Sequence, residues 1–258
     1  LGWTDGANSG KRIRPLLSLL CCSAAGGEWQ RALPMAAAIE LLHNFSLIHD
    51  DIQDNSPLRR GRETVWTKWG QAQAINAGDA MFTLAHLAPQ TLTGRGVSPS
   101  LALHALEQFD QAGLVLTQGQ YLDMSFEKRE RVTVAEYMAM IEAKTAALLA
   151  CAARLGSELA EAEAARSEHF YQYGRSLGLA FQVQDDLLGI WGDPAVTGKS
   201  AASDLEKRKK SLPVVFGLEG SDEFARAYSQ PGGSVAELAA TLEKTGAREF
   251  TQRKAEEL

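Results

Sequence analysis

Three aspartates, Asp50, Asp51 and Asp54, stand close together at the end of a largely apolar segment. On a helix, residues four apart share one face and the adjacent residue is offset by about a quarter turn, so the carboxylates would converge near one helix end. Carboxylates in such a cluster repel one another unless cations lie between them. Hard oxygen ligands suit Mg²⁺, which keeps waters and shares its shell with substrate phosphates. A solvated acidic helix end is the alternative interpretation of this motif alone.

Arg59 and Arg60 follow these aspartates in a segment rich in Pro and Gly. Metal ions would bridge the carboxylates to phosphate, and the arginines would bind the remaining phosphate oxygens. Acidic and then basic residues at one helix end predict a diphosphate-binding site. Salt bridges to the aspartates are the simpler alternative for the two arginines.

A second aspartate pair repeats the pattern later in the chain. The segment 47–54 reads LIHDDIQD and the segment 181–189 reads FQVQDDLLG, and a polar, Gly-containing stretch follows each. Asp185 and Asp186 would therefore lie late in a second apolar helix, with Gln182 about one turn before them. Two such helices facing each other would place carboxylates at one end of a helical bundle.

Basic residues follow the second aspartate pair, beginning with Lys199 and continuing through the charged run 204–210. Such a run is usually a solvated surface segment. Apolar residues resume directly after Lys210, which favours a basic loop that is anchored on both sides and closes on an anion.

Further candidate phosphate ligands lie elsewhere in the chain. Lys11 and Arg14 would lie before the start of an apolar helix, where backbone N–H groups also favour anions; a basic surface segment is the alternative. His43 would lie on an apolar helix face, where a core histidine is the usual interpretation. Lys144 interrupts an apolar segment, and Glu142 is not on its helix face, so Lys144 needs another partner or a ligand.

Apolar residues recur at three- and four-residue spacing in five long segments, without an alternating strand pattern or a βαβ rhythm. This periodicity predicts an all-α fold, and clusters of Gly and Pro predict the turns. The expected helices run from Leu33 to Ile52, Thr64 to Leu87, Leu101 to Leu122, Val134 to Leu155 and Ser167 to Ile190.

The composition of the 258-residue chain is typical of a globular protein, with 45% hydrophobic and 22% charged residues. The net charge of -6 disfavours nucleic acid as a partner. No apolar run reaches the length of a membrane span, and the N-terminal residues lack a signal-peptide pattern. The three cysteines predict buried thiols in a reducing compartment. We therefore expect a cytoplasmic protein with one domain over residues 1–258.

Six blocks of sequence, in order, resemble the trans-type prenyltransferase (polyprenyl synthase) family. They are GKRIRP at 10–15, LLHNFSLIHDDIQDNSPLRRG at 41–61, GQYLDM at 119–124, KTAALL at 144–149, FQVQDDLLGIWGDPAVTGK at 181–199 and DLEKRKKSLP at 204–213. The resemblance implies an isoprenoid-synthase-type helical bundle around a deep apolar cavity, a homodimer, and three Mg²⁺ ions per site. It also implies a transferase that joins an allylic diphosphate to isopentenyl diphosphate.

The resemblance assigns a role to each candidate residue. The metal ligands would be Asp50, Asp51, Asp54, Asp185 and Asp186. Isopentenyl diphosphate would be bound by Lys11, Arg14, His43 and Arg60. The allylic diphosphate would be bound by Arg59, Lys144, Thr145, Gln182, Lys199 and Lys209. The residues expected to act directly in catalysis are Asp50, Asp51, Asp54, Asp185, Lys144 and Lys199.

Product length should depend on Phe45, five residues before Asp50, with the small Ser46 beside it. In the family an aromatic residue at this place accompanies short to medium products, so we expect farnesyl or, by preference, geranylgeranyl diphosphate. The chain departs from the family where Gly189 replaces the third aspartate of the second motif, which would weaken that metal site. Both ends of the chain also look short for the family.

Three other functions are alternatives to a synthase. A class I terpene cyclase shares the helical bundle and the aspartate motif, but GKRIRP, His43 and Arg60 would then have no isopentenyl diphosphate to bind. A non-catalytic partner subunit is disfavoured because the first aspartate motif is intact. A plain helical scaffold leaves Lys144 unexplained.

Overall fold

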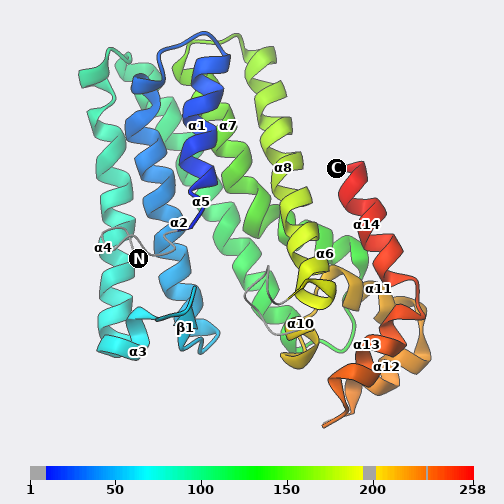
Figure 1. Cartoon of the computed structure of the whole chain (residues 1–258). Helices are drawn as coiled ribbons and strands as arrows, with labels where there is room; N and C mark the ends of the chain where they lie inside the picture. Colours follow the sequence, from blue (N-terminus) through cyan, green and yellow to red (C-terminus); the bar gives the residue numbers. More distant parts are fainter. Residues whose placement is uncertain (1–9, 194–201, 231) are drawn as a thin grey trace. The chain divides into compact units, whose positions relative to one another are not determined.

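The computed structural model describes residues 10–193, 202–230 and 232–258. These residues form helices joined by short connections and one small β-hairpin, which confirms the predicted all-α class (Figure 1). The chain divides into two compact units. The first unit comprises Leu1–Gly113 and Leu148–Gly174, and the second comprises Leu114–Ala147 and Arg175–Leu258.

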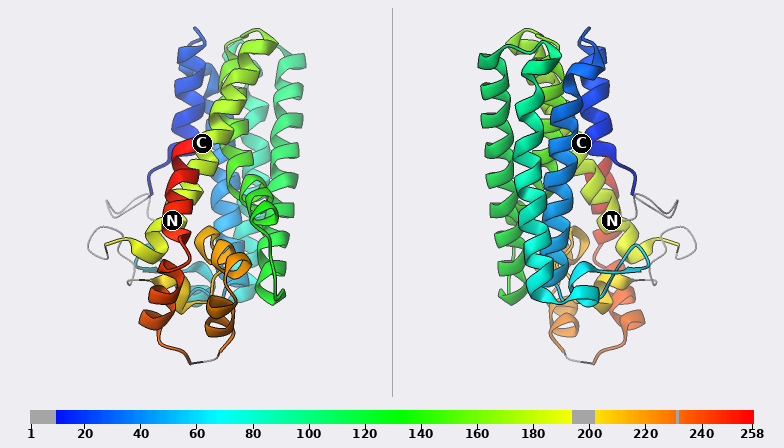
Figure 2. Two further views of the ribbon diagram at one scale, coloured as in Figure 1. Left: turned by 90° about the vertical axis from the view of Figure 1, so that its right-hand side faces the viewer. Right: turned by 90° about the vertical axis from the view of Figure 1, so that its left-hand side faces the viewer.

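The first unit is built on long helices. Its elements are α1 (Ile13–Ala24), η1 (Trp29–Ala32), α2 (Leu33–Gln53), α3 (Val65–Trp69), α4 (Gln71–Leu87), η2 (Ala88–Thr91), η3 (Thr93–Arg95), and parts of α5 (Pro99–Lys128), α7 (Ala147–Leu159) and α8 (Ala164–Trp191). Helix α2 packs along α4 and against α1, as Figures 1 and 2 show.

Helix α2 begins at Leu33, has Pro34 in its first turn, where proline is tolerated, and contains no helix breaker after it. Met35, Ile39 and Leu42 recur at helical spacing and are almost completely buried. Burying one such side chain contributes about 1.5–3 kcal/mol, so this apolar face fixes the rotation of α2. That rotation determines where the aspartates at the end of α2 lie.

A β-hairpin follows α2 in the segment that the sequence predicts as a loop. Strands β1 (Leu58–Arg59) and β2 (Arg62–Glu63) pair antiparallel, and Arg60 and Gly61 form the turn with φ of 54° and 76°. Two positive φ angles are typical of the tight hairpin turn that matches strand twist. Each strand is only two residues long and Leu58 is the one apolar residue in the pair, which explains the absence of a strand signal.

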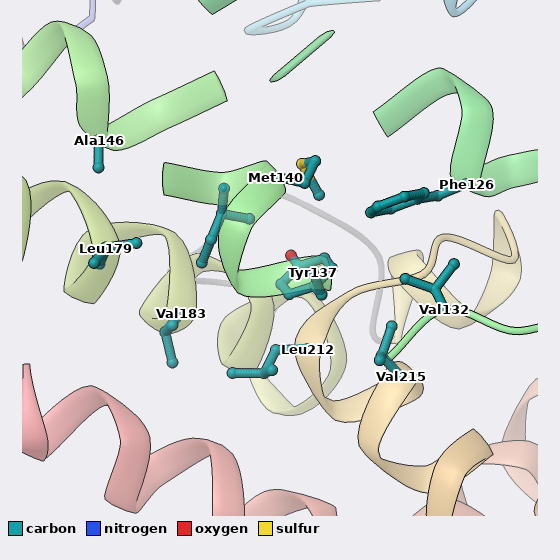
Figure 3. Close-up of a cluster of buried hydrophobic side chains, with 10 residues drawn as sticks. Phe126, Val132, Tyr137, Met140, Ala146, Leu179, Val183, Leu212 and Val215 are labelled. Carbon is teal, nitrogen blue, oxygen red and sulfur yellow. The ribbon is translucent and has the colours of Figure 1, made fainter. Parts of the chain in front are cut away.

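The second unit contains the remaining helices. Its own elements are α6 (Val134–Ile141), η4 (Glu142–Ala146), α10 (Ser203–Glu206), α11 (Leu212–Gly220), α12 (Asp222–Ser229), α13 (Val235–Glu243) and α14 (Ala247–Glu257). Helices α11 to α14 gather in a compact group (Figures 1 and 2). A buried cluster that includes Tyr137, Met140, Val183 and Leu212 forms one core of this unit (Figure 3).

Two predicted helices contain irregularities. The segment Thr64 to Leu87 is interrupted at Gly70, whose φ of 82° ends α3 before α4 begins. The segment Val134 to Leu155 contains the π-helical turn η4. In the described ranges, no helix is both long enough and apolar enough to cross a membrane.

Candidate active site

The first aspartate motif lies at the C-terminal end of α2. Asp50 and Asp51 belong to its last turn, and the N–H of Asp54 donates to the carbonyl of Asp50 over 2.9 Å. Arg59 binds both neighbouring carboxylates: its Nε donates to Asp51 Oδ1 over 2.7 Å and its Nη2 to Asp50 Oδ2 over 3.0 Å. Burial raises the pKa of Asp51, while Arg59 acts in the opposite direction. Arg59 thus supplies the charge that the paired carboxylates require.

The hairpin holds the two arginines in place. Thr64 Oγ1 and Trp66 Nε1 both donate to the carbonyl of Ser56 over 2.9 Å, which closes the base of the hairpin. Arg59 lies on β1 and reaches back to the end of α2. Arg60 lies in the turn, and its guanidinium fits against Gly10, where a Cβ atom would be 2.6 Å from Arg60 Cζ.

A cationic group forms beside this hairpin. Nη1 of Arg14, in the first turn of α1, lies 3.2 Å from His43 Nε2 on α2. Among the described residues, buried Nε of Arg14 has no hydrogen-bond partner. Burial lowers the pKa of Arg14 to about 10, with Glu40 raising it and Arg60 lowering it further. Burial, followed by the charges of Arg14, Arg60 and Arg59, holds the pKa of His43 well below its ordinary value.

His43 therefore lies among the positive charges of Arg14, Arg59 and Arg60, and Nε of Arg14 is a donor without a partner among the described residues. This arrangement suits an anion with several oxygens, because such a ligand can accept from Arg14 and Arg60 together. Lys11 is exposed and precedes α1, whereas Arg14 lies inside the first turn rather than before it.

In the second unit, Lys144 lies on the π-helical turn η4. Its Nζ donates to Asp123 Oδ2 over 2.5 Å, which supplies the partner that the sequence left open. Glu142 instead binds Arg175 through two contacts of 2.6 Å. Gly119 allows α5 to approach η4 closely, because a Cβ atom at position 119 would lie 2.7 Å from Lys144 Cα. Single-turn π-bulges occur frequently at functional sites.

Asp186 is a buried hydrogen-bond acceptor. Its Oδ2 accepts from the hydroxyl of Tyr137 and, over 3.0 Å, from the backbone N–H of Leu212. Its Oδ1 accepts from Gln182 Nε2 over 3.0 Å, and Gln182 Oε1 accepts from Thr145 Oγ1 over 3.0 Å. Burial raises the pKa of Asp186 to about 6, against the opposing effects of Lys209 and these donors.

The adjacent aspartates of the second motif therefore differ. Asp186 is 0% exposed and satisfied by three donors, whereas Asp185 is partly exposed. Tyr137 and Asp123 were missed as candidates from the sequence. Asp123 was inside the quoted block GQYLDM, but nothing in the sequence paired it with Lys144, and Tyr137 had no local polar partner to single it out.

The basic run after Asp204 is divided between structural and electrostatic roles. Lys210 Nζ donates to the carbonyls of Phe126 and Arg129, each over 2.5 Å, and Arg208 donates to the carbonyls of Tyr228 and Gln230. Burial by itself lowers the pKa of Lys209. The pKa is nevertheless raised, because four carboxylates act on the ammonium group: those of Asp186, Asp204, Asp123 and Asp185. Lys209 is therefore the cation of this run that faces the aspartates. Lys199 lies outside the described residues.

The predicted chain-length residue Phe45 lies in a row of aromatic rings. Its ring centroid is 4.7 Å from that of His49 and 5.1 Å from that of Phe82 on α4. Ser46 Oγ donates to the carbonyl of His43 over 2.7 Å.

The carboxylates of the two aspartate motifs are the candidate ligands for a metal ion. In the described parts of the chain, no group of three or more His, Cys, Asp or Glu side chains is already arranged to hold a metal ion. The oxygens of Asp50, Asp51, Asp54 and Asp185 nevertheless have the chemistry of ligands for a hard divalent cation. Asp54 is exposed and Asp50 and Asp185 are partly exposed, so these three carboxylates can be approached.

Comparison with known proteins agrees with this fold. Residues 6–245 match the polyprenyl synthetase family. A (2E,6E)-farnesyl diphosphate synthase from Mycobacterium bovis is 44% identical over 257 residues, covering 94% of this chain and 70% of the relative. A geranylgeranyl diphosphate synthase from Mycobacterium tuberculosis is 41% identical over 271 residues, covering 100% of this chain and 76% of the relative.

A solved structure gives the same result. The geranylgeranyl pyrophosphate synthase from Corynebacterium glutamicum, complexed with isoprenyl diphosphate and magnesium, has a TM-score of 0.86 and 29% identity, covering 97% of this chain and 78% of that chain. The chain belongs to the polyprenyl synthetase family, whose members are prenyltransferases. The resemblance inferred from the six sequence blocks is confirmed.

Proposed function

We propose that the chain condenses an allylic diphosphate with isopentenyl diphosphate, head to tail, to give farnesyl or geranylgeranyl diphosphate and free diphosphate. The names of the two Mycobacterium relatives support these products. The observation that carries the proposal is the group formed by Arg14, His43 and Arg60, in which a buried guanidinium keeps a donor without a partner among the described residues.

The physical argument for this anion site is the cost of crowded positive charge. A buried cation is disfavoured unless a counter-charge and hydrogen-bond acceptors accompany it. Arg14 has Glu40 as a charge partner, but Arg60 opposes it. A diphosphate would provide both negative charge and acceptors. We assign this group, with Lys11, to isopentenyl diphosphate.

The allylic diphosphate would be bound by Arg59, Lys144, Thr145, Gln182, Lys199 and Lys209. Arg59 and Lys144 are held by carboxylates, at 2.7 Å and 2.5 Å respectively. Each cation is thus pre-positioned by a carboxylate and would turn toward the phosphate when the allylic diphosphate binds. We further propose that residues 1–258 form one catalytic domain.

The metal in this proposal is Mg²⁺, three ions per site, consistent with the magnesium in the Corynebacterium structure. When bound, it would neutralise the negative charge that develops on the leaving diphosphate. Asp50, Asp51, Asp54 and Asp185 would hold it. Asp186, predicted as a further ligand, has its oxygens bound by Tyr137, Leu212 and Gln182, so we propose that it positions α8 instead.

The chain's own residues then carry out binding and orientation. Arg14, His43 and Arg60 would hold isopentenyl diphosphate so that its double bond faces the allylic carbon, which lowers the entropic part of the barrier. Arg59, Lys144 and Lys209 would stabilise charge on the leaving group. No side-chain base is assigned, because the released diphosphate would accept the proton lost in the last step.

An extraction assay tests the proposal. Purified protein would be incubated with Mg²⁺, isopentenyl diphosphate and, in separate reactions, dimethylallyl, geranyl or farnesyl diphosphate. A linear prenyl alcohol after dephosphorylation, absent with EDTA, is the expected product. A cyclic hydrocarbon formed from an allylic diphosphate alone would show that the protein is a terpene cyclase and not a synthase. Inactivity under all conditions would contradict both functions.

The proposal includes a homodimer in the cytoplasm. Leu84 and Leu87, three residues apart on α4, are 50% and 49% exposed, and exposed large apolar side chains on one helix face favour association. Light scattering on an eluting gel-filtration peak should give twice the chain mass of 27.9 kDa. A peak at the monomer mass would remove the dimer from the proposal.

A further inference from the structure

Glu142 and Arg175 form a two-point ion pair within the second unit. Nε of Arg175 donates to Oε1 of Glu142 and Nη2 donates to Oε2, each over 2.6 Å. Two parallel charge-assisted bonds fix the orientation of both side chains, because a planar guanidinium matches a carboxylate in few arrangements. Arg175 and Glu142 are 35% and 42% exposed, so solvent screens their attraction. The pair therefore contributes a fixed geometry more than it contributes stability.

Glu142 is the first residue of the π-helical turn η4. The N–H of Ala147 donates to the carbonyl of Glu142, five residues back, where an α-helix would use the carbonyl of Ala143. Such turns are rare because they interrupt the regular ladder of backbone hydrogen bonds. Contacts with neighbouring helices therefore have to favour the π turn over an uninterrupted α-helix.

Helix α8 presents one face to this turn. Two polar and two apolar residues recur on it at helical spacing: Arg175, Leu179, Gln182 and Val183. Leu179 and Val183 belong, with Ala146 of η4, to the buried cluster of the second unit (Figure 3). The apolar members thus place this face of α8 against η4, and the polar members bind the turn on either side of that contact.

The other polar side chains of η4 are candidate substrate ligands. Thr145 Oγ1 donates to Gln182 Oε1 over 3.0 Å, and Lys144 Nζ donates to Asp123 Oδ2 over 2.5 Å. Both Lys144 and Thr145 are assigned above to the allylic diphosphate, so their present contacts change when that substrate binds. Glu142 is assigned to neither substrate nor metal. Its ion pair can therefore support η4 both with and without substrate.

We propose that Glu142 and Arg175 are positioning residues, which hold η4 in the winding that presents Lys144 and Thr145 to the allylic diphosphate. Consecutive residues of a helix point about 100° apart, so rewinding the π turn into an α-helix would redirect these two side chains. The inference rests on the proposed function, because that function assigns Lys144 and Thr145 to the substrate.

Steady-state kinetics on the full chain, with each diphosphate varied in turn, provides the first test. Arg175→Lys keeps the positive charge but cannot form two parallel bonds. It should lower kcat/KM for the allylic diphosphate by about tenfold to a hundredfold, as displaced substrate ligands do, and leave the KM for isopentenyl diphosphate unchanged. Arg154→Lys is the matched control, since Arg154 pairs with Glu168 at similar exposure, and it should change neither quantity.

A double-mutant cycle tests whether the two residues act as one unit. Glu142→Gln should lower kcat/KM for the allylic diphosphate by a similar factor. The variant that combines Glu142→Gln with Arg175→Lys should be no less active than either single variant. Additive losses would overturn the inference. If thermal unfolding shows that Arg175→Lys is not folded, Glu142→Gln alone decides, by the same selective loss or its absence.

Hydrogen exchange, measured by mass spectrometry on a peptide covering residues 142–148, follows the turn independently of activity. These amides should exchange faster in Arg175→Lys than in wild type or in Arg154→Lys, and equal exchange would overturn the inference. Wild-type protein that elongates no prenyl chain would refute the proposed function. Wild-type protein that elongates chains, with unchanged allylic kinetics in Arg175→Lys, would refute this inference alone.

Discussion

The hydroxyl of Tyr137 donates a hydrogen bond to Oδ2 of Asp186, 49 positions away in the chain. Both residues are almost completely buried, and the phenol lies within the apolar cluster of the second unit (Figure 3). A buried carboxylate of this kind is tolerated because three donors share it. The relationship defines Asp186 as a structural anchor placed directly beside Asp185, the proposed metal ligand.

Tyr137→Phe should destabilise the protein by about 1–3 kcal/mol, because it leaves one acceptor position of Asp186 unsatisfied in a buried site. Urea unfolding followed by circular dichroism measures this change. Tyr121→Phe, at an exposed tyrosine, is the control and should be neutral. An unchanged free energy of unfolding in Tyr137→Phe would show that the hydrogen bond contributes nothing net.

Gly119→Ala should displace the backbone at Lys144, because the added Cβ would lie 2.7 Å from Ala143 C and Lys144 Cα. Overpacking of this kind costs about 1–3 kcal/mol, and the moved Lys144 should also lower kcat. Gly113→Ala is a matched control on the same helix, where the new Cβ meets Leu42 Cδ2 at an ordinary 3.5 Å. That variant should be neutral or slightly more stable, by up to about 1 kcal/mol. Equal behaviour of the two variants in thermal unfolding would contradict the close approach.

Arg14→Gln should raise the KM for isopentenyl diphosphate by about tenfold to a hundredfold, as loss of a charge-assisted hydrogen bond does. Stability should stay constant or increase, because the variant removes a buried cation and its desolvation cost. Steady-state kinetics with varied isopentenyl diphosphate measures the first effect. Arg95→Gln, at an exposed arginine, should change neither quantity. A rise in the KM of the allylic substrate alone would reverse the assignment of Arg14.

His43 should make the protein less stable in acid. Its pKa in the folded protein lies below the ordinary value of 6.5, so as pH falls below that value the unfolded chain gains a proton that folded His43 does not. The free energy of unfolding should therefore decrease toward low pH, by at most about 1.4 kcal/mol per pH unit for one proton. His43→Gln should reduce that slope, and His169→Gln, at an exposed histidine, should keep the wild-type slope. Identical slopes in wild type and His43→Gln would contradict the burial of a neutral imidazole.

Phe45→Ala should lengthen the prenyl product, because it removes a large ring from the proposed path of the growing chain. Phe82 packs against Phe45 with centroids 5.1 Å apart, so Phe82→Ala should loosen the same place and lengthen the product to a smaller degree. Mass analysis of dephosphorylated products measures chain length. Phe216→Ala, at a ring stacked on Phe250, should leave product length unchanged. An unchanged product in Phe45→Ala would mean that this ring only packs the core.

Periodicity was sufficient to predict the long helices and the all-α class. The expected helix Leu33 to Ile52 became Leu33–Gln53, because its buried face repeats without a break. The π-helical turn at Lys144 could not be predicted, since one extra residue per turn hardly alters a short apolar pattern. The hairpin at Arg59 and Arg60 could not be predicted because its strands are only two residues long, too short for an alternating pattern.

The candidate residues were recognisable individually, but their partners were not. Asp185 and Asp186 are equivalent in the sequence, and only packing against Tyr137 and Leu212 makes one of them a buried anchor. Asp123, as the partner of Lys144, and Asp204, beside Gly189, depend on contacts between remote segments. Such contacts depend on how each helix is rotated about its own axis. That rotation is determined by packing of the whole core and not by any local sequence motif.

The position of Asp186 also has a consequence for synthesis on the ribosome. Its carboxylate needs Tyr137, made early, and the N–H of Leu212, made 26 residues after it. A nascent chain that ends before Leu212 would expose a buried acid with an incomplete set of donors. The second unit should therefore close in one late cooperative step, and C-terminal truncations should be degraded rather than accumulate as stable fragments.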